Sequence, residues 1–241
     1  MTRVNTYGQA VGDALPNWHP RSLPEKTTLK GKSCRLEPLE LEKHGKQLYE
    51  AYSKAEDDRM WTYVPLGPFQ DYAEYAKVAA AFSNSTTAPH YAVVNNATDR
   101  AVGSIALINC DPNNGSVEVG YVLFSPELQR TVISSEAVYL LIKYALETLR
   151  YRRCEWKCDS LNEASGRAAQ RFGFKFEGTF RNAAVYKGRT RDTRWYSITD
   201  YEWPLVFRAF NEWLSDANHL NGQQKERLAD IRSKIENETA T

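Results

Sequence analysis

A single carboxylate beside a glycine is the first feature of this sequence that could do chemistry. Both Glu118 and Gly120 fall in the apolar run 117–124 (VEVGYVLF). If this run is a strand, alternation directs Glu118, Gly120 and Val122 to one face and Tyr121 to the other. Glycine leaves space beside the acid, and a carboxylate in a partly apolar cleft can act as a general base. The alternative is a hairpin-edge glutamate paired with a lysine or arginine.

A second stretch carries the residue types that bind phosphate groups. Residues 129–135 (QRTVISS) immediately precede and open an apolar, helix-forming segment. The first N–H groups of a helix lack internal partners and carry partial positive charge, so they attract anions. Ser134 and Ser135 add hydroxyl donors, and Arg130 adds a positive charge. The alternative is an ordinary helix start with serine caps.

The elements that would position both stretches follow one another closely. The strand at 117–124 precedes a helix at about 134–149, a strand at 153–158 and a helix at about 161–172 that Gly173 ends. This β–α–β–α order requires a parallel or near-parallel strand pair. Small molecules with phosphate groups usually bind where such a strand passes into its helix.

Hydrophobic periodicity and turn residues predict the remaining elements. The DPNNG turn at 111–115 predicts a hairpin that pairs 101–109 antiparallel with 116–124. The fold class is therefore α/β (α+β), with a mixed, mostly antiparallel sheet flanked by helices. The other predicted strands are 32–36, 90–95, 175–181, 185–187 and 194–203, and the other predicted helices are 41–53, 71–82, 205–214 and a solvated tail helix at 223–238.

Composition excludes several classes of function. The chain of 241 residues has 31 Lys+Arg and 30 Asp+Glu, a net charge of +1, so no basic face for nucleic acid is expected. Its apolar runs are far shorter than the roughly 18 residues of a membrane span. The first 16 residues contain no apolar signal segment. A cytoplasmic protein without nucleic-acid or membrane partners is the expectation.

Cysteine and histidine usage indicates neither disulfides nor a metal site. Cys154 and Cys158 would share one strand face, and the four cysteines together are too sparse for a disulfide framework. The four histidines are scattered, without metal-ligand spacing. We expect buried thiols and no metal.

The ordered set of motifs resembles the acetyl-CoA-binding core of the GNAT superfamily of N-acetyltransferases, and within it the RimJ/RimL-like branch. The resemblance covers roughly residues 29–205. It is carried by 118–121 (EVGY), Gln129, 135–137 (SEA), Asn162, Ser165, 171–174 (RFGF) and 177–178 (EG), with 35–39 (RLEPL) similar to the first strand and 59–63 (RMWTY) similar to a helix-to-loop turn. It implies a sheet that splays where acetyl-CoA enters.

The resemblance also implies roles for individual residues. It points to Glu118 as the base, to the backbone of Tyr121, Val122, Leu123 and Phe124 as the pantetheine-pairing strand, and to Gln129, Arg130, Thr131, Val132, Ile133, Ser134 and Ser135 as the phosphate loop. Asn162 is implied at pantetheine and Ser165 near the thiol, where its hydroxyl would protonate the leaving thiolate; Arg171 would reach the phosphate or adenine end, or else lie on a solvated helix face.

Two departures from the family pattern bear on these roles. Val132 and Ser134 stand where the family loop usually has glycines, which permit close backbone approach. Ala169 stands where many relatives carry a tyrosine that protonates the thiolate. A Ser160-x-x-Glu163 capping box is expected to start the second helix, which leaves Asn162 free.

Two groups are candidates for the acceptor pocket. Acidic and aromatic residues in the turn at 57–63 would suit a cationic amine, and basic residues farther along would suit a carboxylate. The alternative for both groups is packing and surface pairing. The substrate-binding candidates are Asp58, Arg59, Trp61, Tyr63, Arg181 and Tyr186.

The function expected is transfer of acetyl from acetyl-CoA to a primary amine by direct attack, without a covalent enzyme intermediate or a metal. The acceptor is a small-molecule amine or a peptide N-terminus, and a homodimer is a further hypothesis. The rival is a non-catalytic acyl-CoA-binding or regulatory module on the same fold. The expected organisation is an extended arm at 1–28, a domain at 29–205 and a helical extension at 206–241.

Overall fold

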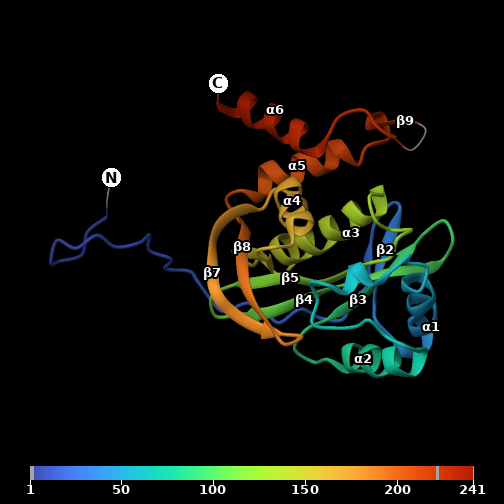
Figure 1. The fold of residues 1–241 in the computed structure, drawn as a ribbon. Coiled ribbons are helices and arrows are strands. Elements are labelled where there is room, and N and C mark those ends of the chain that lie inside the picture. The colour runs from blue at the N-terminus through green and yellow to red at the C-terminus, as the bar shows by residue number, and fades with distance from the viewer. Residues whose placement is uncertain (1–2, 221–222, 241) are drawn as a thin grey trace.

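The computed structural model describes residues 3–220 and 223–240 and is built around one eight-stranded sheet (Figure 1). The strand order is β1-β2-β3-β4-β5-β6-β8-β7, and each neighbouring pair is antiparallel except the parallel pair β5 and β6. The strands are β1 (Leu29–Lys30), β2 (Cys34–Pro38), β3 (His90–Asn95), β4 (Arg100–Asp111), β5 (Ser116–Phe124), β6 (Arg153–Asp159), β7 (Lys175–Tyr186) and β8 (Arg189–Thr199), with a separate short pair β9 (His219–Leu220) and β10 (Gln223–Gln224).

The helices lie close to their predicted positions. α3 begins two residues earlier than expected and passes into a π-helical turn at Tyr144–Thr148, and α4 ends at Gly173, whose φ of 102° only glycine adopts readily. The helices are α1 (Leu41–Tyr52), α2 (Tyr72–Asn84), α3 (Val132–Lys143), α4 (Glu163–Phe172), α5 (Trp203–Trp213) and α6 (Leu228–Ala240), with 3₁₀ turns at Asp58–Trp61 and Asp216–Asn218.

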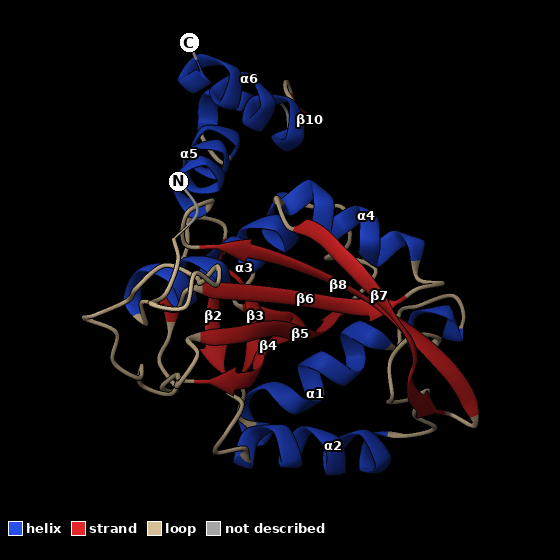
Figure 2. Ribbon diagram, turned by 90° about the vertical axis from the view of Figure 1, so that its left-hand side faces the viewer, coloured by secondary structure: helices blue, strands red, loops and turns tan. Residues whose placement is uncertain are grey.

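Helices cover the sheet in two layers (Figure 2). α1 and α2 lie on one face, against β3 and β4, and α3 and α4 lie on the other, with α5 and α6 packed beyond α4. The larger hydrophobic core fills the α3–α4 side, where Tyr91, Leu141 and Phe210 are fully buried, and a smaller core lies beneath α1 and α2 around Leu48 and Trp61. The predicted mixed, mostly antiparallel sheet flanked by helices is confirmed.

The sheet is divided between its two parallel strands. β5 and β6 pair at three positions only, from Ser116–Arg153 to Glu118–Glu155. Beyond them β5 continues to Phe124 on β4, while β6 continues to Asp159 on β8, so the facing edges no longer pair. The sheet is therefore splayed from Glu118 onward, as the fold prediction required.

The N-terminal arm contacts the domain through Trp18, and the C-terminal helix differs from its prediction. Trp18 of the N-terminal arm packs against Gly115 and donates its indole N–H to the Asn113 carbonyl, but Tyr7 and Leu15 remain 86% and 44% exposed. The arm is thus docked only in its second half. The prediction of a solvated tail helix is wrong, because α6 buries Leu228, Ile231 and Ile235 in the larger core.

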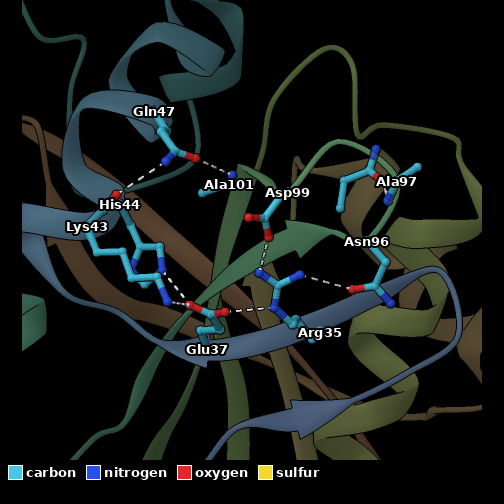
Figure 3. A network of polar contacts seen from close by, with 10 residues as sticks. Arg35, Glu37, Lys43, His44, Gln47, Asn96, Ala97, Asp99 and Ala101 are labelled. Atoms are coloured by element: carbon cyan, nitrogen blue, oxygen red, sulfur yellow. Dashed lines mark hydrogen bonds and ion pairs between the residues drawn. The ribbon is translucent and has the colours of Figure 1, made fainter.

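A closed polar network joins β2 to the start of α1 (Figure 3). Glu37 accepts from Arg35 Nε at 2.7 Å through Oε1, and its Oε2 lies 2.5 Å from Lys43 Nζ and 2.9 Å from His44 Nε2. The other ring nitrogen of His44 accepts the Glu40 backbone N–H at 3.1 Å. Although burial raises the pKa of Glu37, hydrogen bonds from Lys43, Arg35 and His44 outweigh it and lower that pKa to about 2.

Candidate active site

Glu118 lies buried at the point where β5 and β6 separate. Its Oε2 accepts from Asn109 Nδ2 on β4 at 2.8 Å and lies 2.9 Å from Lys157 Nζ on β6. Lys157 also lies 2.8 Å from Glu155 Oε2 and 3.8 Å from the centre of the Trp195 ring. The predicted alternative of a paired glutamate therefore holds for one oxygen of this carboxylate.

The second oxygen of Glu118 is not used by the protein. Within residues 3–220 and 223–240, Oε1 has no hydrogen-bond partner. The side-chain atoms there that are both fully buried and without a partner are Ser125 Oγ and His219 Nε2, so Oε1 is not fully buried. It therefore reaches solvent. A Cβ at Gly120 would lie 3.8 Å from this oxygen and 2.4 Å from Ile108 Cδ1, so a larger residue here would have to displace the Ile108 side chain.

A bulge in β5 changes which face its next residues occupy. Tyr121 has a φ of 45°, and the pairing with β4 shifts register here. Its ring therefore lies 5.2 Å from His90 and 5.0 Å from Phe82 of α2, on the same face as Glu118, while Val122 packs against the larger core. Strict alternation predicted the reverse for Tyr121 and Val122, and that prediction is wrong.

The start of α3 presents unpartnered backbone N–H groups. Thr131 is the N-cap, and its hydroxyl oxygen accepts the Ser134 N–H at 3.2 Å. In the described part of the chain, the N–H groups of Arg130, Val132 and Ile133 have no hydrogen-bond partner. The left-handed residue of the loop is Arg130, with φ of 61°, and the side chains of Val132 and Ile133 pack against the core. The start of α3 thus keeps unpartnered N–H groups although Val132 and Ser134 replace the family glycines.

Three predicted cofactor residues make contacts around this helix start. Arg171 Nη1 donates to Ser135 Oγ at 2.9 Å, and the guanidinium also stacks on Trp213, with the ring centre 4.9 Å away. Burial lowers the pKa of Arg171, which forms no ion pair with any described residue. A half-buried cation thus lies beside the first turn of α3, while the Gln129 side chain is occupied by the Phe124 carbonyl at 2.9 Å.

The start of α4 corrects a prediction. Asn162 is the N-cap, and its side-chain oxygen accepts the Ser165 N–H at 3.1 Å, so the expected Ser160–Glu163 capping box is not formed. Ser165 Oγ accepts the Trp156 indole N–H at 2.9 Å, and its hydroxyl also contacts the Cys158 thiol. Trp156 belongs to the core on the α3–α4 side, so Ser165 and Glu118 lie on opposite faces of the sheet. Only a group held between β5 and β6 would contact both.

Part of the predicted acceptor set is brought together across the molecule. Lys187, at the β7–β8 turn, donates to the carbonyls of Trp61 at 2.6 Å and Leu66 at 3.0 Å. The adjacent Tyr186 donates its hydroxyl to Asp159 Oδ2 at 2.7 Å, at the end of β6. Burial and the Asp159 carboxylate raise the pKa of Tyr186 to about 12. The hairpin tip and the aromatic turn thus enclose the C-terminal end of β6.

Of the remaining predicted acceptor residues, Arg59 and Arg181 lie apart on the surface, whereas Asp58 lies near Trp61 and Tyr63 lies near Tyr186. Arg59 is exposed and pairs with Asp57 at the start of its own 3₁₀ turn, as the alternative of surface pairing predicted. Arg181 is exposed on β7. Asp58 lies at a pocket of about 380 Å³ whose aromatic walls include Tyr52 and Trp61. Tyr63 is half-buried near Tyr186.

Sequence reasoning missed Lys157 and Asn109. A signal for Lys157 was present, because Arg153, Glu155 and Lys157 alternate with apolar residues and must share one strand face. Nothing marked Asn109, whose side chain reaches Glu118 through a left-handed backbone with φ of 49°. The four cysteines are free thiols, and the described residues include no group of three His, Cys, Asp or Glu side chains that could hold a metal ion.

Comparisons with known proteins identify the family. Residues 34–175 match the acetyltransferase (GNAT) domain family. A solved GCN5-related N-acetyltransferase from Brucella melitensis is 40% identical, with a TM-score of 0.89, and the match covers 91% of this chain and 100% of that one. The chain belongs to the GNAT acetyltransferase family.

Curated relatives agree with this assignment. The Bacillus licheniformis "Uncharacterized N-acetyltransferase p20" is 26% identical over 150 residues, which are 61% of this chain and 84% of that protein. The Bacillus subtilis (strain 168) "Putative ribosomal N-acetyltransferase YdaF" is 34% identical over 101 residues, 42% of this chain and 55% of that protein. The predicted membership of the GNAT superfamily is confirmed. No helix in the described ranges is long and apolar enough to cross a membrane.

Proposed function

We propose that this protein transfers acetyl from acetyl-CoA to a primary amine by direct attack. The observation that carries the proposal is the open start of α3, with unpartnered N–H groups and the unpaired Arg171, next to the unpaired edges of β5 and β6. The helix start and Arg171 suit the diphosphate of coenzyme A. The free edge of β5 at 121–124 suits the pantetheine amides, which would add to it as a further strand does.

The chemistry requires a neutral amine, because an ammonium has no lone pair with which to attack a thioester. Glu118 Oε1 is the oxygen that we assign to take the amine proton, directly or through water. The amine nitrogen forms a bond to the acetyl carbonyl carbon, the carbon–sulfur bond breaks, and the leaving thiolate takes a proton. Ser165 is the assigned donor: its hydroxyl passes a proton to the thiolate as it takes one from water, and Glu118 returns the amine proton to solvent.

The assignment of regions follows from these sites. Residues 29–205 carry Glu118, the α3 start and the acceptor residues, so we assign acetyl transfer to this segment. We also propose that the protein is cytoplasmic. Residues 1–28 and 206–241 are assigned as an arm and an extension. A relative is named as a ribosomal N-acetyltransferase, so peptide N-termini belong in the acceptor panel beside small amines.

The test measures thiol release from acetyl-CoA with a panel of small amines and short peptides. We expect acceptor-dependent release and a higher melting temperature with acetyl-CoA. Arg171→Met should weaken acetyl-CoA binding about 10-fold, the loss of roughly 1.4 kcal/mol for a charged hydrogen-bonding partner. Arg167→Met, an exposed arginine on the same helix, is the matched control and should bind normally.

Other outcomes separate the alternatives. Binding of acetyl-CoA without release by any acceptor would favour a non-catalytic acyl-CoA-binding module. Absence of both release and a melting shift would overturn the acetyl-CoA assignment itself.

A further inference from the structure

Glu118 is held by only one of its two carboxylate oxygens. Its Oε2 is contacted from the strand on each side of β5, by Asn109 of β4 at 2.8 Å and by Lys157 of β6 at 2.9 Å. Its Oε1 has no partner in the described part of the chain, reaches solvent, and lies toward Gly120, where β5 and β6 part. The carboxylate is thus fixed in orientation with one oxygen left for a ligand.

The backbone of β4 departs from regular geometry to make the first of these contacts. Ile108 lies on the face of Glu118, where its Cδ1 blocks the space beside Gly120. Alternation would direct the next residue, Asn109, to the opposite face. The left-handed conformation at Asn109 and the register shift after Ile108 turn the amide back to Glu118. Asparagine is among the few residue types that adopt this conformation readily.

Lys157 is itself fixed by its surroundings. Only 14% of its side chain is exposed, and its ammonium lies between Glu118, Glu155 and the Trp195 ring. Burial lowers the pKa of Lys157, but the carboxylates of Glu155 and Glu118 outweigh this effect and raise it, so the group stays an ammonium. Arg153 pairs with Glu155 from the other side, so charges alternate along β6 up to Glu118.

We propose that Lys157 and Asn109 are positioning residues that hold Glu118 through Oε2, so that Oε1 alone faces the acceptor amine. The inference rests on the proposed function. The ammonium of Lys157 also lies between the carboxylates of Glu118 and Glu155, 2.9 Å from the first and 2.8 Å from the second. Besides Lys157, the charged or titratable groups around Glu118 among the described residues are Glu155 on β6, with Arg153 behind it, and Cys154 on the opposite sheet face. Farther along the face of Glu118 lie Tyr121 and His90.

The experiment compares pH profiles of kcat/KM for the wild type, Lys157→Met and Lys157→Arg, each with the same active acceptor so that its own titration is common to all. In Lys157→Met, Glu118 faces Glu155 without a cation between them. We expect the acidic limb of its profile to move up by at least about one pH unit. On the acidic side of both limbs, Lys157→Met should be about 10-fold less active than wild type or lower, and its activity should return to within a few-fold of wild type above its shifted limb.

Two further variants separate charge from geometry. Lys157→Arg retains the cation and should keep the limb within about half a pH unit of wild type. Asn109→Gly keeps the left-handed backbone and removes an uncharged contact, so kcat/KM should fall a few-fold at every pH without a shift of the limb. These two variants carry the test if Lys157→Met does not fold, as judged by its melting transition.

Distinct results would overturn the inference. A loss in Lys157→Met that is the same at all pH values would reduce Lys157 to a structural role. A limb moved equally by Lys157→Met and Lys157→Arg would contradict the charge argument. If the wild-type protein releases no thiol with any acceptor, the proposed function is wrong. That result is distinguishable from failure of the positioning inference, because it is seen before any variant is compared.

Discussion

Two carboxylates in this molecule are buried to a similar extent but differ in how many of their oxygens the protein pairs. Glu37 and Glu118 are 8% and 6% exposed, and each contacts a lysine. Both oxygens of Glu37 are used, by Arg35 on one side and by Lys43 and His44 on the other (Figure 3). Glu118 uses only Oε2. The number of oxygens left free therefore distinguishes a carboxylate that joins elements from one that is available to a ligand.

The largest expected effect follows from replacing each carboxylate by its amide. Glu118→Gln should lower kcat/KM by at least about 100-fold, the range for losing a general base, while unfolding free energy changes by less than about 1 kcal/mol. Glu37→Gln should leave kcat/KM within about 3-fold. The checks are thiol release and urea unfolding on both variants. Equal activity losses in the two variants would remove the distinction between them.

Acid should act on the Glu37 network through stability. The pKa of Glu37 is lowered to about 2 in the folded state, so its contribution is complete above the ordinary value near 4.5 and is lost as pH falls from there toward 2. At pH 6, Glu37→Gln should be less stable than wild type by about 2 kcal/mol. By pH 3 this difference in unfolding free energy should narrow to about half. Urea unfolding of both proteins at both pH values measures the difference, and a difference independent of pH would contradict the ion-pair account.

The smallest effect is expected at Lys43, the counterpart of Lys157. The Lys43 side chain is 54% exposed, against 14% for Lys157. An exposed ion pair contributes little, so Lys43→Met should reduce unfolding free energy by no more than about 0.5 kcal/mol and leave the pH profile of activity unchanged. Thermal melting and the same kcat/KM profile provide the measurement. If the acidic limb of the kcat/KM profile moved in Lys43→Met as it does in Lys157→Met, the limb would depend on the net charge of the protein and not on the cation beside Glu118.

The sequence predicted regular elements well where side-chain periodicity and turn chemistry agree. The DPNNG turn predicted the β4–β5 hairpin, and Gly173 predicted the end of α4. Residues whose positions depend on a backbone irregularity were not predicted. The bulge at Tyr121 reversed the faces of Tyr121 and Val122, and the one at Asn109 brought an amide to Glu118. A left-handed residue other than glycine leaves no periodic signal, so alternation fails at these positions.

Long-range contacts were a second limit. Lys187 donates to carbonyls of residues more than 120 positions earlier, and the tail helix is buried only because α4 and α5 offer it an apolar surface. Local composition describes α6 as polar and solvated, since only three of its side chains enter the core. Such outcomes are decided by tertiary packing, which can override local preference.

The three-pair contact between β5 and β6 has a consequence for the rate of unfolding. Strands β1 to β5 pair with sequence neighbours, and β6, β7 and β8 pair within one later segment. Three paired positions and the connection at 125–152 join these two halves of the sheet. The cleft proposed to bind the acetyl donor lies where the two halves meet. A ligand that bridges both strand edges would therefore slow unfolding more than it speeds folding.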